Sequence, residues 1–97
     1  MAKKGYWIVC HVSGADPAVM AEYGKAARPV LEGGGGRLIL RGVPAKVAES
    51  GMNEPAVVVE FESLAKAVEV YESAAYQAAA KILAGKVKRD VRIVEAV

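Results

Sequence analysis

The segment from Val57 to Tyr71 limits the possible folds of this chain more than any other. Residues 57–61 form an apolar and largely β-branched run, which is typical of a buried strand. From Ser63 onward the apolar residues instead recur at a spacing near four, which is typical of an amphipathic helix. They are Leu64, Ala67, Val68 and Tyr71. A buried strand therefore leads directly into a helix that buries one side.

Three further strands are predicted, at residues 6–12, 37–41 and 91–94. Aromatic, branched and other apolar residues predominate in each of them, and turn-forming residues separate them from the neighbouring elements. The strand that precedes the helix spans residues 56–61. Residues 45–48 are expected to stay extended between two clusters of turn-forming residues.

Asp16 and Pro17 predict the start of the other helix. An aspartate at this position can cap free backbone amides, and proline is tolerated in the first turn. Pro29 is expected to kink this helix or to end it one turn early, and the glycines at 33–36 are expected to stop it. Because these glycines follow a helix and lead into a strand, they lack the order of a phosphate-binding loop. The second helix is expected to bend near Ser73.

The elements therefore follow the order strand, helix, strand, strand, helix, strand. This is the order of the split βαβ arrangement. We predict an α+β protein with the ferredoxin-like βαββαβ fold, in which a four-stranded antiparallel sheet carries both helices on one face. A chain of 97 residues lies within the usual range of one domain, about 50–250 residues, so residues 1–97 are expected to form a single domain.

Two helices cover only one face of such a sheet, so the composition of the other face predicts what it contacts. Strand alternation assigns an almost wholly apolar set to the helix-covered face: Ile8, Cys10, Val12, Leu38, Leu40, Val57, Val59, Phe61, Val91 and Ile93. It assigns a mixed set to the open face: Trp7, Val9, His11, Arg37, Ile39, Arg41, Val58, Glu60, Arg92 and Val94. The chain is also 54% hydrophobic, above the usual share of about 45–50%. We therefore expect a homodimer joined through its sheet faces, a dimeric α/β barrel.

The charge distribution argues against a nucleic-acid partner. The net charge is +2, from 13 basic and 11 acidic residues. Nucleic-acid binding calls for a basic face with interleaved aromatic side chains. The chain has one local basic cluster, formed by Lys86, Lys88, Arg89 and Arg92, and Asp90 interrupts it. We interpret this cluster as a solvated approach to the last strand.

The start of the chain predicts neither a signal peptide nor a membrane span. Its apolar run breaks at His11, whereas a spanning helix needs about 20 apolar residues. We expect a cytoplasmic protein with no membrane partner. Cys10 is the single cysteine, so it forms no disulfide within the chain and is interpreted as a small buried hydrophobe. With a single histidine and no nearby ligands, neither a metal nor another cofactor is expected.

His11 is the candidate catalytic residue, since an imidazole with a pKa near 6.5 can act as an acid or a base around neutral pH. From the open face it is expected to approach Glu60 or Arg92. Arg37 and Arg41 lie four positions apart on one strand, so they are expected to share a face about 13–14 Å apart. That distance is too great for both to hold one small anion, and Arg41 is assigned as the anion-binding residue.

The remaining candidates for substrate binding are Tyr71, Tyr76 and Glu60. The two tyrosines flank the expected helix bend, and each supplies an apolar face and a hydroxyl group, which is typical of a pocket wall. Each candidate also has a structural interpretation. His11 can be satisfied in a dimer interface, Arg41 can form an ion pair with Glu60 or another acid, and Tyr71 can belong to the core.

The chain resembles the bacterial family known as domain of unknown function 1330. The resemblance runs from Gly5 to Glu95 and rests on Gly5-Tyr6-Trp7-Ile8-Val9, Asp16-Pro17, Tyr23, Pro29, Gly35-Gly36-Arg37, Arg41-Gly42, Val59-Glu60-Phe61, Ser63 and Tyr71-x-Ser73-x-x-Tyr76-Gln77. It implies a small dimeric α/β-barrel protein and no particular reaction. The chain departs from the family's pattern at Met20, Val70 and Leu83, where tyrosine, tryptophan and arginine are common. If these positions line a shared pocket, that pocket is more apolar here and binds anions less well.

Two classes of function remain open, and a purely structural dimer, whose closed cavity would have no room for a ligand, is a third possibility. By analogy with other dimeric α/β barrels, the first is a cofactor-independent enzyme, oxygenase- or isomerase-like, that acts on a small organic acid or lactone. The second is a non-catalytic protein that binds a small molecule or has an accessory role in stress. The second class would use the same cavity without a titrating group, so replacement of His11 by glutamine separates the two.

Overall fold

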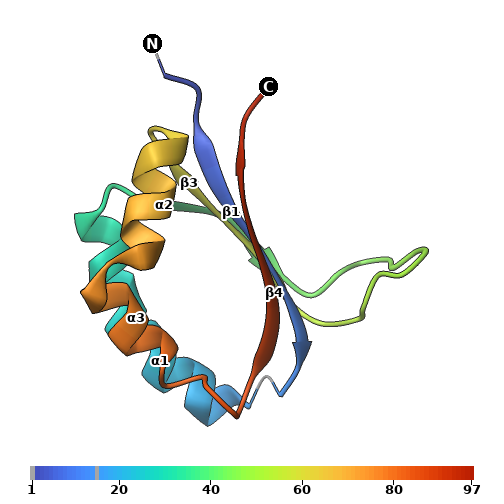
Figure 1. Cartoon of the computed structure of the whole chain (residues 1–97). Coiled ribbons are helices and arrows are strands. Elements are labelled where there is room, and N and C mark those ends of the chain that lie inside the picture. Colours follow the sequence, from blue (N-terminus) through green and yellow to red (C-terminus); the bar gives the residue numbers. More distant parts are fainter. Residues whose placement is uncertain (1, 15) are drawn as a thin grey trace.

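The computed structural model describes residues 2–14 and 16–97 and has two layers, a four-stranded sheet and the helices that cover one of its faces (Figure 1). The elements are β1 (Gly5–Ser13), α1 (Pro17–Gly33), β2 (Arg37–Gly42), β3 (Ala56–Phe61), α2 (Leu64–Glu72), α3 (Ala74–Ala80) and β4 (Lys88–Glu95). Neighbouring strands are antiparallel, in the order β2-β3-β1-β4. The predicted ferredoxin-like α+β fold is confirmed.

Helix α1 begins and ends where its sequence predicts. The side chain of Asp16 accepts a hydrogen bond of 2.9 Å from the amide of Ala18. At the other end Gly35 has φ +79°, a left-handed conformation that favours glycine. Pro29 does not end the helix early, since α1 continues to Gly33. Because Pro29 has no amide hydrogen, the carbonyl of Lys25 lacks its helical partner. Both residues are exposed, so water can donate a hydrogen bond to this carbonyl.

The predicted bend after α2 is confirmed at Ser73, which separates two helices. The hydroxyl of Ser73 donates to the carbonyl of Val70 at 2.7 Å and accepts from the amide of Tyr76 at 3.2 Å. One side chain therefore ends α2 and caps α3. The new direction of the chain places Tyr76 of α3 against Tyr23 of α1, where Tyr76 is 1% exposed.

The register of β1 decides which of its side chains face the helices. Trp7 lies opposite Val59 of β3 and Ile93 of β4, and directly opposite residues share a face of the sheet. The sequence-based assignment of β1 was therefore wrong. Both sides of β1 are rich in apolar residues, so its own alternation does not distinguish them, and the partner strands decide. Trp7, Val9 and His11 face the helices, whereas Ile8 and Cys10 face the open side.

A one-residue bulge in β2 reverses its faces partway along the strand. The pairing with β3 shifts between Leu38 and Leu40, which leaves Ile39 without an opposite residue. A shift of one residue moves every later side chain to the other face. Arg37 therefore lies on the open face and Arg41 on the helix-covered face, and the prediction that they share a face was wrong. Leu40 likewise lies on the open face.

The segment between β2 and β3 projects from the sheet on the side away from the helices (Figure 1). We call residues 43–55 the arm. Residues 45–48, which were expected to be extended, lie in the arm and form no strand there. Its exposed apolar side chains are Val43, Val47 and Met52.

The best-packed part of the core lies between the sheet and helices α2 and α3. Ala67 of α2 is fully buried, and its carbonyl accepts a hydrogen bond of 2.8 Å from the indole of Trp7. β1 and α2 approach closely at Gly5, where an added Cβ would lie 2.6 Å from Cα of Leu64. In the described part of the chain, no helix is long and apolar enough to cross a membrane.

Candidate functional site

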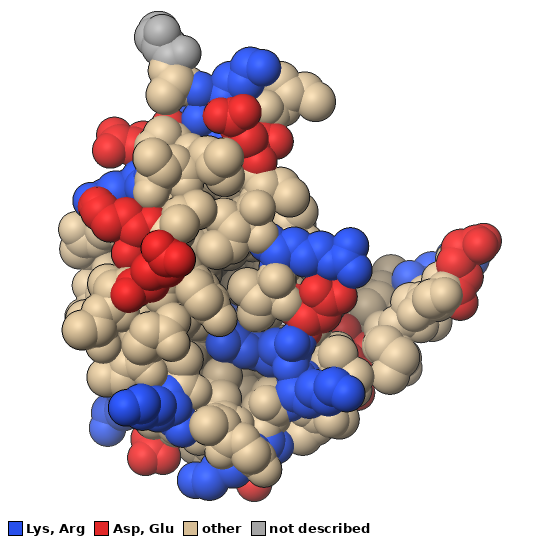
Figure 2. Space-filling model, viewed as in Figure 1, with Lys and Arg blue, Asp and Glu red and all other residues tan. Residues whose placement is uncertain are grey.

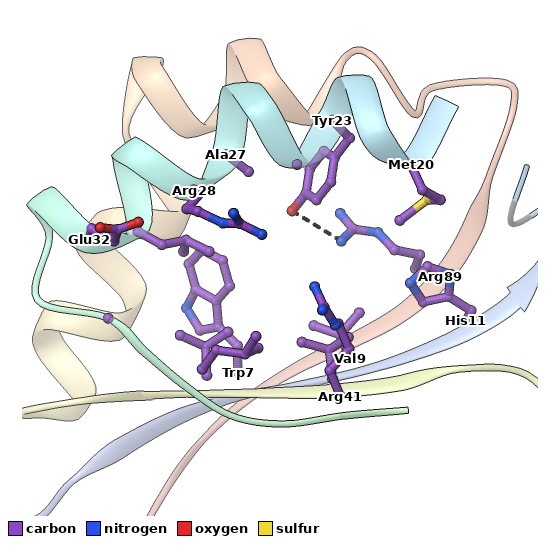
Figure 3. A pocket seen from close by; sticks show the side chains of 16 residues that line it. Trp7, Val9, His11, Met20, Tyr23, Ala27, Arg28, Glu32, Arg41 and Arg89 are labelled. Atoms are coloured by element: carbon purple, nitrogen blue, oxygen red, sulfur yellow. Dashed lines mark hydrogen bonds between the residues drawn. The ribbon is translucent and has the colours of Figure 1, made fainter. Parts of the chain in front are cut away.

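A cavity of about 340 Å³ lies between α1 and the helix-covered face of the sheet. This volume falls within the range of about 300–1,000 Å³ that small-molecule pockets usually have. The lining side chains come from α1 and from all four strands, and Figure 3 shows α1 above them and the sheet below. We call this cavity the α1 pocket.

The α1 pocket exists because the side of α1 that faces the sheet carries small residues at its centre. The lining residues of α1 recur every three or four positions, as one side of a helix requires: Met20, Tyr23, Gly24, Ala27, Arg28, Leu31 and Glu32. A Cβ added at Gly24 would meet no atom within 4 Å. Glycine inside a helix costs roughly 0.5–1 kcal/mol relative to alanine. Gly24 therefore weakens the helix and leaves room beneath it.

The floor of the α1 pocket is apolar at one end and polar at the other. β1 contributes Trp7, Val9 and His11, which alternate along the strand and span about 13 Å at roughly 3.4 Å per residue. Figure 3 shows Trp7 and His11 at opposite ends, with Tyr23 reaching down from α1 between them. A ligand with an apolar body and a polar head would match this gradient.

Arg89 organises the polar end. Its Nη1 donates to the hydroxyl of Tyr23 at 3.4 Å, and its Nη2 donates to the hydroxyl of Tyr76 at 3.2 Å. The guanidinium carbon also lies 5.1 Å from the centroid of the Tyr23 ring. Among the residues with described positions, no acidic side chain forms a salt bridge with Arg89. The half-buried cation is therefore held by neutral phenols.

The phenol of Tyr76 remains protonated near pH 7. Burial, and then the neighbouring Tyr23, raise the pKa of Tyr76 well above its ordinary value. The hydroxyl oxygens of Tyr23 and Tyr76 lie 2.6 Å apart, joined by a hydrogen bond. Neither phenol supplies the negative charge that would compensate Arg89.

His11 lies beside Arg89 in the α1 pocket (Figure 3). The residue is 4% exposed, and its Nδ1 is buried without a hydrogen-bond partner among residues 2–14 and 16–97. Burial, and then the charge of Arg89, lower the pKa of His11, while Glu54 acts more weakly in the opposite direction. The imidazole is therefore neutral at pH 7 and can accept a proton.

The mouth of the pocket is also positively charged. Arg28, Glu32 and Arg41 line it and are exposed. Together with Arg89, three arginines and one glutamate line the cavity, so its charge favours an anion. On the molecular face shown in Figure 2, basic and acidic side chains are interspersed.

Two of the residues predicted as site residues line this pocket, namely His11 and Arg41. Tyr76 lies behind Tyr23 and reaches the site through its hydrogen bonds. The remaining two predicted residues lie elsewhere. Tyr71 packs edge-on against Trp7, with ring centroids 5.5 Å apart, outside the pocket lining.

Glu60 lies on the open face, where its carboxylate accepts a hydrogen bond of 2.9 Å from the hydroxyl of Tyr6. The expected approach of His11 to Glu60 or Arg92 does not occur, because the sheet separates them. The cause is the reversed assignment of β1.

Sequence reasoning missed Arg89 and Tyr23 as functional residues. Arg89 precedes Val91 by two positions and therefore faces the helices. This spacing was a usable signal, but Arg89 was instead interpreted as part of a solvated basic cluster. Of the three departures from the family's pattern, Met20 lines the pocket, whereas Leu83 and Val70 are buried outside its lining. The arginines make the pocket better suited to anions than those departures predicted.

No three or more His, Cys, Asp or Glu side chains gather as metal ligands in the described part of the chain. The polar groups that line the α1 pocket are three guanidinium groups, one phenol, one neutral imidazole and the carboxylate of Glu32 at the mouth. This set of groups suits an organic anion better than a cation.

The family described as "domain of unknown function (DUF1330)" matches residues 4–97 of the chain. The chain belongs to the DUF1330 family. No curated relative matches this DUF1330 protein.

Solved structures of other proteins have the same fold. A protein of unknown function from Rhodopseudomonas palustris superposes with a TM-score of 0.74 and 18% identity, covering 100% of this chain and 85% of the other. A Thermobifida fusca protein described as dimeric and ferredoxin-like has a TM-score of 0.67 and 15% identity, covering 99% and 93%. A Caulobacter crescentus protein, provisionally named an antibiotic biosynthesis monooxygenase, has a TM-score of 0.58 and 12% identity, covering 98% and 92%. At these identities the likeness concerns the fold of this DUF1330 protein.

Proposed function

We propose that this protein binds a small organic acid with an apolar body in the α1 pocket. The observation that carries the proposal is Arg89, a half-buried guanidinium whose partners among the described residues are two neutral hydroxyls. A buried charge without a counter-charge is costly, whereas a carboxylate can accept two hydrogen bonds from one guanidinium. The bound acid supplies the missing negative charge.

The apolar end of the pocket determines the rest of the ligand. Trp7, Val9, Val57 and Val59 form a floor of aromatic and branched side chains. A ligand that spans from this floor to Arg89 carries a hydrophobic or aromatic group on its acid head. Arg41 at the mouth adds attraction for the anion during entry.

The first test compares phenylacetate with its neutral isostere phenylacetamide by calorimetry and thermal shift. We expect the acid to bind and to stabilise the protein, and the amide to bind at least tenfold more weakly. Arg89→Met should reduce the affinity for phenylacetate by tenfold or more, since a hydrogen bond to a charged group contributes about 1.5–3 kcal/mol.

Arg92→Met is the matched control, because it removes the same charge from the other face of the same strand. It should bind phenylacetate as the unaltered protein does. Equal binding of the acid and the amide, or full affinity in Arg89→Met, would contradict the proposal.

One observation favours catalysis as a second candidate function. The neutral imidazole of His11 lines the polar end of the pocket and can accept a proton. We infer a cofactor-independent enzyme of the isomerase or oxygenase kind that acts on the bound acid or on a lactone. His11→Gln should abolish turnover and keep binding in an enzyme. A non-catalytic binding or stress-associated accessory protein has no turnover to lose.

We also propose that two copies associate through the open sheet face. Ile8, Leu40, Val58 and Val94 give that face an apolar centre, and the arm adds exposed apolar side chains on the same side. The Thermobifida fusca and Bacteroides fragilis structures are described as dimeric. Light scattering at micromolar concentration should give twice the chain mass of 10.2 kDa, and Val58→Glu should reduce it to one chain. A monomer in the unaltered protein would disprove the dimer without affecting the α1 pocket.

A further inference from the structure

The hydrogens of the Tyr23–Tyr76 pair can be assigned by counting donors and acceptors. The two hydroxyl oxygens are 2.6 Å apart, and each also accepts a hydrogen bond from Arg89. A hydroxyl group has one hydrogen. One of the two phenolic hydrogens therefore lies between the oxygens, and the other points to a different acceptor.

Burial decides which tyrosine donates to the other. Tyr76 is 1% exposed, and among the described residues its hydroxyl has no acceptor other than Tyr23. If Tyr23 donated to Tyr76, the hydrogen of Tyr76 would be buried without an acceptor, which costs about 1–3 kcal/mol. Tyr76 therefore donates to Tyr23. The hydrogen of Tyr23, which lines the cavity, is directed into the α1 pocket.

This assignment makes Tyr23 a polarised donor. Its oxygen accepts from Tyr76 and from the cationic Arg89, and hydrogen bonds in such a chain strengthen one another. Figure 3 shows the phenol of Tyr23 reaching from α1 toward the centre of the pocket, with Arg89 and His11 at the same end. A hydroxyl donor and a neutral imidazole thus line the same cavity.

We propose that Tyr23 donates to the carbonyl oxygen of a bound 2-oxo acid while the imidazole of His11 removes a proton from the adjacent carbon, so that the pocket enolises its ligand. This inference rests on the proposed binding of an organic acid and assigns its chemical class. A 2-oxo acid carries the carboxylate that Arg89 needs, a carbonyl beside it for Tyr23, and an acidic C–H bond. A hydrophobic substituent on that carbon would extend toward Trp7.

The step needs no oxidant or further reactant. The electron pair of the C–H bond becomes the C=C bond of the enolate, and the π pair of the carbonyl moves onto its oxygen. That oxygen is stabilised by the Tyr23 hydrogen and by the positive charge of Arg89. The proton resides on the imidazole of His11 and returns to the same carbon in the reverse step. In D2O a deuteron returns instead.

The experiment follows the exchange of the C3 protons of phenylpyruvate for deuterium by proton NMR, with the exchange in buffer subtracted. Phenylpyruvate labelled with ¹³C at C2 gives a second readout, since a hydrogen bond to the carbonyl shifts its resonance downfield. We expect the unaltered protein to accelerate exchange and to shift the bound carbonyl resonance. Tyr23→Phe should bind phenylpyruvate within threefold of the original affinity, exchange it about 10²-fold more slowly and lose the carbonyl shift.

Two variants separate this role from a structural one. Tyr71→Phe removes a phenolic hydroxyl from the same aromatic cluster outside the pocket lining, and it should change neither readout. Tyr23→Phe leaves the Tyr76 hydrogen without an acceptor, so the double variant Tyr23→Phe/Tyr76→Phe is measured in case the single variant unfolds. It should exchange as slowly as Tyr23→Phe.

The outcomes distinguish the two proposals. If the unaltered protein binds phenylpyruvate and Tyr23→Phe retains full exchange or the carbonyl shift, the role of Tyr23 is wrong and acid binding stands. Binding without any exchange in the unaltered protein rejects enolisation alone. If no acid binds at all, or if Arg89→Met binds as before, the proposed function fails and the role of Tyr23 fails with it.

Discussion

Two parts of one sheet face, on either side of Trp7, are filled in opposite ways. Beneath α2 and α3, the indole packs against Phe61 at 5.1 Å and Tyr76 at 4.8 Å between ring centroids, and its nitrogen donates to Ala67. Beneath α1, the same indole borders a cavity of about 340 Å³. Aromatic rings of the sheet and of α3 pack together in the first part, whereas α1 carries Gly24, where an added Cβ would meet no atom within 4 Å.

The difference indicates how a chain of 97 residues can contain both a stable core and a site. The α2–α3 side supplies aromatic contacts and a buried hydrogen bond, which hold one wall of the pocket in place. The α1 side leaves Arg89 and His11 without acidic partners in the described structure, which costs stability and prepares the site for a ligand. Stability and binding are therefore expected to respond separately to substitutions on the two sides.

The largest effect is expected from truncation on the packed side. Trp7→Ala should lower the free energy of unfolding by about 3–5 kcal/mol, because it opens a cavity and leaves the Ala67 carbonyl without its donor. Met20→Ala on the pocket side should cost about 1 kcal/mol or less, since it enlarges an existing cavity. Urea unfolding of both variants measures the difference. Similar losses would mean that the two sides contribute equally to stability.

A substitution that fills the pocket should separate binding from stability. Gly24→Leu replaces a helix-weakening residue and places a side chain in open space, so we expect about 0.5–1 kcal/mol of added stability. The same side chain occupies the ligand's volume and should reduce phenylacetate affinity about 100-fold. Lys25→Leu, next to it on the exposed side of α1, is the control for helix propensity and should bind normally. Loss of stability in Gly24→Leu would show that there is no open space for a side chain at Gly24 of α1.

The smallest effect is a pH dependence that comes from His11. Burial, and then Arg89 of β4, lower its folded-state pKa, opposed by Glu54 just before β3. Below about pH 6.5 the unfolded chain binds a proton that the folded chain does not, so stability falls as pH decreases from 6.5 toward the folded pKa. The slope is at most about 1.4 kcal/mol per pH unit.

His11→Gln should remove this slope and leave the rest of the pH profile unchanged. Unfolding midpoints in urea between pH 5 and pH 7.5 provide the measurement. A slope that persists in the variant would assign it to another group and would place a charged His11 in the folded protein.

The elements of the fold could be predicted because their signals are local. Asp16 caps α1 through a hydrogen bond two residues away, and Ser73 does the same for α3 within three residues. The strand at residues 56–61 has the predicted bounds, since turn-forming residues and a capping serine flank it. Interactions over a few residues are set by side-chain type, and the sequence contains them directly.

The site depends on contacts that no local pattern contains. β1 is apolar on both sides, so its neighbours in the sheet, and not its own alternation, turned His11 toward the helices. The bulge at Ile39 moved Arg41 to the same side. Arg89 was predictable from its spacing to Val91, but its partnership with Tyr23 joins residues 66 positions apart in the chain. Register and long-range pairing are tertiary properties, and they decided the composition of the pocket.

The bulge in β2 has an evolutionary consequence. Because Ile39 has no opposite residue, its deletion would leave Arg41 opposite Val57, on the pocket side. Insertion of one residue between Leu40 and Arg41 would instead place the new residue opposite Val57 and rotate Arg41 out of the pocket mouth to the opposite surface. The polar end around Arg89 lies on β4, at the other edge of the sheet, and would keep its contacts. The gain of a single codon can thus change the charge that an incoming ligand meets, while the residues that hold its head group stay in place.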